Sequence, residues 1–270
     1  MKIQQLLESD LNTTSEESQI NAVQYNPTWI DKITNPSERV QLAAIQSRAP
    51  WPQPGSGDFG RYKQDEILKL ILKKGIVPSK RVQLAAVKVY GLAILTLINH
   101  GIMPSEQAQL AVVKSDPLVL EHIPNPSERV QMAAVHTYGN AIEFIPNPSE
   151  AMCLVAVQRP NTDAIRYIPN PSEAVQLASV KQMASSIGHI KNPTEAVQLA
   201  AVQKSTKSFK YIANPTHRAT MTAFLNMSYR DWATRPGNKS LMISELRRMY
   251  RLHPDWDDLH TFADDIGIKL

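Results

Sequence analysis

The sequence predicts an all-α protein, an α-solenoid of about nine stacked short helical hairpins with a helical cap at each end. Two observations predict it: a motif of eleven residues recurs along most of the chain, and the copies carry a helix-opening signature. The close copies read NPSERVQLAAI from Asn35, NPSERVQMAAV from Asn125, NPSEAVQLASV from Asn170 and NPTEAVQLAAV from Asn192. Looser copies start at Thr13, Val77, Met103, Asn147 and Asn214.

The repeat has a nearly constant period. The position that holds proline in the motif falls at Thr14, Pro36, Pro78, Pro104, Pro126, Pro148, Pro171, Pro193 and Pro215. The steps between these positions are 22, 42, 26, 22, 22, 23, 22 and 22 residues. A unit of this length is too small to bury its own apolar face, so consecutive units are expected to stack and bury it between them.

Each motif is expected to open the first helix of a hairpin. In the copy at Asn147, we expect Asn147 to be the N-cap residue, Pro148 to take the first helical position and Glu150 to reach back from the third. A helix of roughly ten to twelve residues should follow, within the usual length of a globular helix. A short second apolar segment then ends in isoleucine, as in AIEFI, AIRYI, SSIGHI and FKYI.

Three regions follow from this pattern: a capping helix at residues 1–13, the repeat array at 14–226 and a helical cap at 227–270. The step of 42 residues reflects an insertion at about 47–66, which is too rich in proline and glycine to be helical. An apolar helix is expected directly after it, at residues 64–75. In the C-terminal cap, one helix is expected near Lys239–Leu252.

The composition sets broad limits on the function. Hydrophobic residues make up 43% of the chain, which is ample for burial, and the net charge of +4 permits an anionic partner without requiring one. The single cysteine, Cys153, excludes an internal disulfide and fits a reducing compartment. No apolar run approaches the roughly 20 residues that span a bilayer, and no signal peptide is recognised. We therefore expect a cytoplasmic protein with no membrane partner.

Aligning the copies on the motif proline, numbered zero, turns the repeat into columns. Apolar residues occupy columns +4, +6, +7, +8 and +9, which leaves only the sector with columns +3 and +10 to face solvent. A glutamine recurs at column +5, and we expect it to hydrogen-bond neighbouring backbone. The alternative is that these glutamines recognise a ligand. These glutamines are Gln19, Gln41, Gln83, Gln109, Gln131, Gln176 and Gln198, and Cys153 replaces them once.

The solvent sector predicts a mildly basic ribbon along one surface. Its cationic members are Arg39, Arg81, Lys88, Lys114, Arg129 and Lys181. Such a ribbon could contact the phosphates of a nucleic acid. The alternative is that these side chains stay solvated near helix ends, where a cation suits the helix dipole.

Two further columns have a structural and a functional interpretation. Four residues before each motif proline stand Lys32, Lys74, His100, His122, Phe144, Tyr167, His189 and Tyr211. These side chains could stack on bases or grip a peptide, but closing the gap between units is the favoured interpretation. The glutamate that recurs at column +2 is sufficiently explained by helix capping, so it is not assigned a catalytic role.

The insertion is the strongest candidate for a binding site. It brings together residue types favoured at binding hot spots: Arg48, Trp51, Phe59, Arg61, Tyr62 and Lys63. Loops of this length usually bind a partner or lack structure, and solenoids place non-repeating loops where partners bind. We predict that these six residues contact a protein partner, with docking of the loop onto adjacent units as the alternative.

The C-terminal cap contains six residues that could act as acids, bases or metal ligands: Asp255, Asp257, Asp258, His260, Asp264 and Asp265. Their spacing matches no catalytic or metal motif, and acids after Pro254 suit the start of a helix. No phosphate-binding loop, zinc-protease or nucleophile-elbow motif occurs elsewhere. The sequence therefore predicts no enzyme, no metal and no cofactor.

The motif NPSExVQLAAV with its AIxxI half-repeat resembles short helical repeats of about 22 residues in bacterial and bacteriophage proteins of uncharacterised function. The resemblance covers residues 14–224 and excludes the insertion and the C-terminal cap. It implies an α-solenoid and a phage or prophage origin, and it brings no catalytic residues. In such a setting, the implied role is a phage-encoded inhibitor or adaptor that acts on a host protein.

The sequence favours a non-enzymatic protein-binding solenoid, acting through its extended surface, the insertion and the C-terminal cap. One alternative is nucleic-acid binding through the basic ribbon, against which the modest net charge argues. The other alternative is an enzyme that uses the Asp and His residues of the C-terminal cap. The oligomeric state does not follow from the sequence.

Overall fold

The computed structural model describes residues 10–47, 65–226 and 238–252, together with the single positions Pro254, Asp264 and Lys269. Within the described ranges, every regular element is an α-helix or a 3-10 helix (η), so the all-α prediction is confirmed there. The chain divides into two compact units, Met1–Ile145 and Pro146–Leu270. The boundary lies inside the predicted repeat array, directly before the motif that starts at Asn147.

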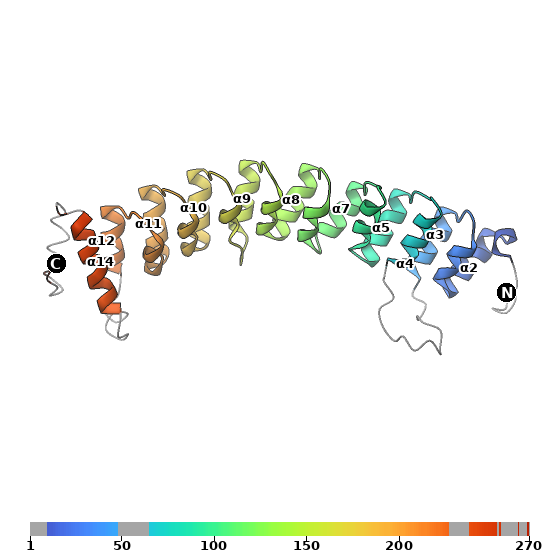
Figure 1. The fold of residues 1–270 in the computed structure, drawn as a ribbon, viewed down its shortest axis with the longest axis horizontal. Helices are drawn as coiled ribbons and strands as arrows, with labels where there is room; N and C mark the ends of the chain where they lie inside the picture. Colours follow the sequence, from blue (N-terminus) through green and yellow to red (C-terminus); the bar gives the residue numbers. More distant parts are fainter. Residues whose placement is uncertain are drawn as a thin grey trace. The chain divides into compact units, whose positions relative to one another are not determined.

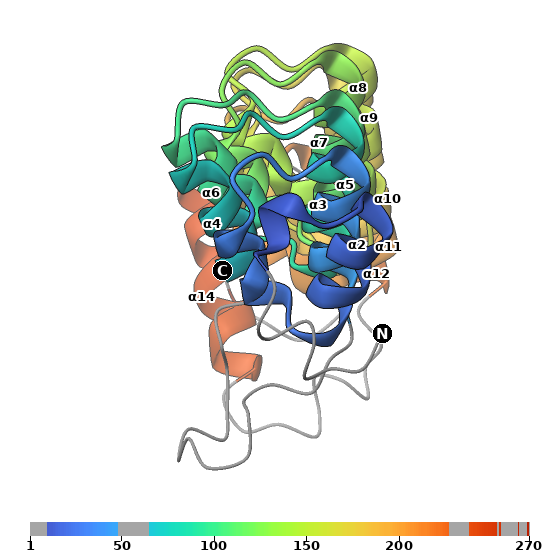
Figure 2. The same cartoon turned by 90° about the vertical axis from the view of Figure 1, so that its right-hand side faces the viewer.

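In the first unit, motif helices alternate with shorter second segments. The motif helices are α2 (Glu16–Tyr25), α3 (Glu38–Gln46), α5 (Lys80–Val89), α7 (Glu106–Val113) and α8 (Glu128–Thr137). The other elements are η1 (Leu11–Thr13), η2 (Pro27–Lys32), α4 (Glu66–Lys73), α6 (Ala93–Asn99), η3 (Pro117–His122) and η4 (Gly139–Phe144). Each motif helix packs against the next (Figure 1), and α4, which contacts η2 and α6, lies with α6 in a second row (Figure 2).

The second unit has the same organisation. Its motif helices are α9 (Glu150–Gln158), α10 (Glu173–Gln182), α11 (Glu195–Lys204) and α12 (His217–Asn226). The elements between and after them are η5 (Ala164–Tyr167), η6 (Ala184–His189), η7 (Thr206–Tyr211) and α14 (Asn238–Leu252). Consecutive motif helices pack in order from α9 to α12, and η6 contacts both η5 and η7.

The N-cap of each motif helix is the serine or threonine after the motif proline, so the predicted asparagine cap is wrong. In α9, Ser149 has extended backbone angles, and its Oγ accepts a hydrogen bond from the Met152 N–H at 3.3 Å. Equivalent caps open the motif helices from α2 to α12. The helix therefore begins at Glu150, which occupies the first helical position and cannot close a capping box from the third.

In three motif copies, the asparagine turns the chain before the helix begins. Asn125, Asn170 and Asn192 adopt positive φ angles of 46°, 49° and 50°. Asparagine tolerates this left-handed region better than most other non-glycine residues because its short side chain can hydrogen-bond locally. The residue type that suggested a cap therefore serves a different local purpose.

Most second segments are 3-10 helices, which explains their AIxxI spacing. A 3-10 helix has about three residues per turn, so residues three apart lie one above the other. Ile142 and Ile145 are accordingly both buried, as are Ile187 and Ile190. Two second segments are α-helices: α4 follows the insertion, and α6 lies in the stretch where the third unit is four residues longer than most others. The α-helix predicted at residues 64–75 is confirmed, and Gly75 after it has a φ of 73°.

The core is narrower than the columns predicted. In α10, the side chains at columns +4, +8 and +9 (Val175, Ser179 and Val180) are buried, whereas Leu177 and Ala178 at columns +6 and +7 are half-buried. Columns +6 and +7 are also half-buried in α3, α7, α8, α9 and α11. The prediction that these two columns are part of the core is therefore wrong for most copies, and the helices present an apolar stripe to solvent.

The predicted glutamine ladder is confirmed. The Gln83 Nε2 donates to the carbonyl of Pro78 in its own motif at 3.0 Å, and its Oε1 accepts from the Ser105 N–H of the next motif at 2.8 Å. Gln198 likewise accepts from the Thr216 N–H at 2.8 Å. The bond to the carbonyl of the motif proline recurs at Gln41, Gln109, Gln131, Gln176 and Gln198. At Gln83 and Gln198 the amide therefore joins neighbouring motif loops, whereas the Oε1 atoms of Gln41 and Gln176 are buried without a hydrogen-bond partner among the described residues.

Parts of the predicted caps are described. In the N-terminal cap, η1 covers Leu11–Thr13 with Leu11 buried, while residues 1–9 lie outside the described residues. In the C-terminal cap, α14 matches the helix predicted near Lys239–Leu252, and its Leu246 and Met249 are buried. None of the helices in the described ranges has the length and apolar character needed to cross a membrane.

Asp65 is a buried carboxylate that ties α4 to α6. Its Oδ2 accepts a hydrogen bond from the Thr96 Oγ1 at 2.8 Å and lies 2.8 Å from the Lys69 Nζ. Burial by itself would raise the pKa of Asp65, but hydrogen bonds from Lys69 and Thr96, together with the charge of Lys69, lower it. Because the pKa of the folded state is below that of the unfolded state, the carboxylate stabilises the fold at neutral pH. That contribution is lost as the pH falls through the lowered pKa.

We expect Asp65→Asn to lower the melting temperature at neutral pH and to reduce its decrease on acidification, because the neutral amide takes up no proton. Melting curves between about pH 7 and pH 3 span the titration of an aspartate and test this. Glu66→Gln, a change of the half-buried neighbour, should keep the acid sensitivity of the unchanged protein. If acidification lowers the melting temperature of Asp65→Asn as much as that of the unchanged protein, the stabilising role of the Asp65 carboxylate is contradicted.

We expect Ser172→Ala to lower the free energy of unfolding by about 1–2 kcal/mol, because α10 loses its N-cap. Urea titration followed by circular dichroism measures this. The matched control is Ser185→Ala in η6, where an exposed serine makes no cap, and the change should stay within about 0.5 kcal/mol. Equal effects of the two substitutions would show that the cap does not stabilise the repeat.

Candidate protein-binding surface

Most of the site residues predicted outside the repeats fall beyond the described part of the chain. The partner-binding residues of the insertion, Arg48, Trp51, Phe59, Arg61, Tyr62 and Lys63, lie outside the described residues. The same holds for Asp255, Asp257, Asp258, His260 and Asp265 in the C-terminal cap. Asp264 is described, and it is exposed in a helical conformation. The candidate surface is therefore built from the repeat columns.

The three arginines of the basic ribbon are paired with glutamates of the preceding repeat. The distances between guanidinium nitrogen and carboxylate oxygen are 2.7 Å for Arg39–Glu16, 3.4 Å for Arg81–Glu38 and 3.7 Å for Arg129–Glu106. The pairs are solvent-exposed, so each contributes little to stability. Their larger consequence is that much of the positive charge of the ribbon in the first unit is compensated, while Lys88 and Lys114 remain exposed.

The same glutamates accept hydrogen bonds from the cap residues of the next repeat. The Ser127 Oγ donates to the Glu106 Oε1 at 2.7 Å, while its lone pair accepts the helix N–H of Val130. The equivalent pairs are Ser37–Glu16, Ser79–Glu38, Ser172–Glu150 and Thr194–Glu173. The hydrogen bond from Ser37 lowers the pKa of Glu16, as does Arg39. The glutamate at column +2 therefore links repeats and does not cap its own helix.

Three motif helices of the second unit have alanine at column +3, where three helices of the first unit have arginine. Column +3 holds Ala151 in α9, Ala174 in α10 and Ala196 in α11, and all three are exposed. Together with the half-buried columns +6 and +7, they form a surface that we call the alanine face. It consists of Ala151, Leu154, Val155, Ala174, Leu177, Ala178, Ala196, Leu199 and Ala200. No arginine–glutamate pair flanks it among the described residues of this unit.

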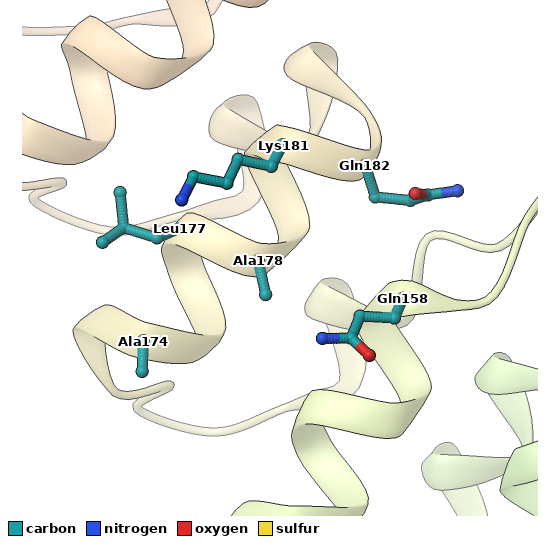
Figure 3. Close-up of a pocket in the computed structure, with 6 residues that line it drawn as sticks. All are labelled: Gln158, Ala174, Leu177, Ala178, Lys181 and Gln182. Atoms are coloured by element: carbon teal, nitrogen blue, oxygen red, sulfur yellow. The ribbon is translucent and has the colours of Figure 1, made fainter.

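A groove of about 450 Å³ lies on the alanine face between α9 and α10. Its apolar wall is formed by Ala174, Leu177 and Ala178 of α10. Its polar groups come from Gln158 at the end of α9 and from Lys181 and Gln182 at the end of α10. Figure 3 shows the Gln158 amide reaching from α9 toward the side of α10 that carries Ala178, while the Leu177 and Lys181 side chains extend away from Gln158. The lining carries one positive charge and no carboxylate.

A second cavity, of about 260 Å³, lies where Cys153 replaces the recurrent glutamine. It is lined by the motif loop of Pro148 and by the next motif loop, which contains Ser172. Cys153 is buried. Burial raises the pKa of its thiol, and the charge of Glu150 raises it further, so the thiol is protonated at neutral pH.

The column of rings and cations before each motif proline makes contacts within the protein. The Lys74 Nζ donates to the Asp31 carbonyl at 2.6 Å and lies 3.7 Å from the Asp31 carboxylate. The His189 Nε2 lies 2.9 Å from an oxygen of Asp163. Both contacts connect neighbouring repeats, which favours the interpretation that these side chains close the gap between units.

The comparisons with family models, curated proteins and solved structures gave no match to this chain. Among the described residues, no group of three or more His, Cys, Asp or Glu side chains could hold a metal ion. The geometry of the repeats is therefore what supports a candidate site. Sequence reasoning did not single out the alanine face. The available signal was the run of three consecutive alanines at column +3, Ala151, Ala174 and Ala196, in a column that elsewhere holds a charged residue or glutamine.

Proposed function

We propose that the protein is a non-enzymatic α-solenoid of about nine repeats that binds another protein through the alanine face of α9, α10 and α11. The stacking of consecutive motif helices within each unit supports the solenoid. The observation that carries the binding site is the groove of about 450 Å³ between α9 and α10. Apolar walls with a few polar groups at the edge are typical of surfaces that bind a partner.

The lining of the groove indicates the chemistry of the partner. Alanine side chains are small, so the backbone of an extended segment or a helix can approach α10 closely. Lys181 provides a cation for a carboxylate of the partner, and the amides of Gln158 and Gln182 provide donors and acceptors for its backbone. A segment with small apolar side chains beside an acidic residue fits these groups.

A protein is favoured over a nucleic acid for two reasons. Nucleic-acid binding draws much of its affinity from uncompensated cations that release counterions. In the first unit, Arg39, Arg81 and Arg129 are instead paired with glutamates. In the second unit, the candidate surface is mainly apolar. The resemblance of the motif to repeats of bacterial and bacteriophage proteins makes a bacterial host protein the partner to test, with this chain as its inhibitor or adaptor.

We expect Ala174→Arg to abolish partner binding without unfolding the chain. The introduced side chain fills the groove, and arginine is the residue of this column in α3, α5 and α8, where it pairs with the preceding repeat. The measurement is capture of bacterial lysate proteins on the immobilised full chain, followed by mass spectrometry and a melting curve for each variant. The charge-matched control, Ser185→Arg, places the same side chain at an exposed position of η6.

A protein that is captured by the unchanged chain and by Ser185→Arg, but lost with Ala174→Arg, supports the alanine face. Equal capture by all three chains would show that the groove is not the binding site. Capture that disappears after nuclease treatment would instead support nucleic-acid binding, and repeating it at higher salt would then measure the number of phosphate contacts.

A further variant tests the insertion, whose six predicted contact residues remain part of the proposal. Residues 48–63 are replaced by a short Gly-Ser linker, which leaves the repeat helices unchanged. If the insertion contacts the same partner, capture weakens by a measurable factor while the melting temperature stays constant. Unchanged capture would restrict the binding surface to the repeats.

A further inference from the structure

We propose that the cavity over Cys153 binds a primary carboxamide, the side chain of an asparagine or glutamine of a partner protein. The site lies between two motif loops of the second unit, one containing Pro148 and the other Ser172. The proposal is independent of the alanine face, because it rests on a comparison of this step of the array with the steps at Gln83 and Gln198.

In six other repeats, the glutamine amide donates to the carbonyl of the motif proline, and in two of these it also accepts from the next motif loop. At the step from Pro78 to Ser105, the Gln83 amide donates to the proline carbonyl at 3.0 Å and accepts from the serine N–H at 2.8 Å. At the step from Pro193 to Thr216, the Gln198 amide makes the same two bonds, at 3.1 Å and 2.8 Å. At these two steps the gap between motif loops presents one acceptor and one donor, and a carboxamide satisfies both.

At Cys153 the loops are present and the amide is not. The thiol ends at the γ position, well short of the amide of a glutamine, and it is a weak hydrogen-bonding group. Among the described residues, nothing donates to the Pro148 carbonyl or accepts from the Ser172 N–H. The space that the glutamine would fill is the cavity of about 260 Å³, which opens to the surface between the loops.

The two free backbone groups select the chemistry of the ligand. A primary carboxamide carries an N–H donor for the Pro148 carbonyl and an oxygen acceptor for the Ser172 N–H. A carboxylate has no donor for the carbonyl, and it would be repelled by Glu150, which also lines the cavity. An ammonium group has no acceptor for the N–H. The apolar side chains of Ile168 and Val175 contact the aliphatic stem that carries the amide.

The test is titration of the isotopically labelled full chain with propionamide and, separately, with propionate, followed through the Ser172 amide resonance. We expect a saturable shift of that resonance with propionamide in the millimolar range, as a ligand of so few atoms allows. We expect no saturable shift with propionate, which has the same shape without the donor.

Two variants at Cys153 test whether the response to propionamide comes from the cavity: one fills it and the other leaves it open. Cys153→Gln restores the residue of the other repeats, so we expect the Ser172 resonance to shift without ligand and to stop responding to propionamide. Cys153→Ala leaves the cavity open, so its response should match that of the unchanged chain. The proposal is overturned if the unchanged chain does not respond, if propionate shifts Ser172 equally, or if Cys153→Gln responds like the unchanged chain.

Discussion

The stacking of the repeats depends on side chains that satisfy backbone groups of two motif loops at once. The motif helices span only eight to ten residues, and helices of this length are not stable alone in water. The serine or threonine cap accepts a hydrogen bond from an N–H at the start of its helix, and in five motif copies its hydroxyl also donates to the glutamate of the preceding repeat. At Gln83 and Gln198, the glutamine amide likewise bonds both the carbonyl of its own motif proline and an N–H of the next motif loop. Register between neighbours is thereby set by directional bonds in addition to apolar packing.

The same network leaves the solvent side of the helices free to vary. In the first unit, that side carries arginines that are compensated by glutamates of the preceding repeat. In α9, α10 and α11 of the second unit, it carries alanines, and a groove opens between α9 and α10. Because the caps and glutamines maintain the fold, column +3 can switch from a charged to an apolar surface without loss of stacking. A repeat array can in this way keep the same helix packing along its length while the surfaces of different segments differ in charge and polarity.

Much of the fold could be predicted from the sequence, because its signals act over a few residues. The period of the motif predicted where the helices lie, and the helices at residues 64–75 and near Lys239–Leu252 occur where they were expected. The glutamine was also assigned correctly, since a polar side chain between buried columns must find a backbone partner. The cap was assigned to the wrong residue, because Asn and Ser are both good caps and Asn170 instead takes a left-handed turn.

The sequence by itself determined the all-helical class, the repeat period and the buried columns +4, +8 and +9 of the motif helices. Only the tertiary structure decided which groups of neighbouring repeats meet. Glu106 and Ser127 are 21 positions apart, so no local signal could pair them. The half-exposure of Leu177 and Ala178 and the groove beside them likewise depend on how closely α9 and α10 approach. Helix formation responds to residues within one or two turns, whereas surfaces and cavities arise from the distances between helices.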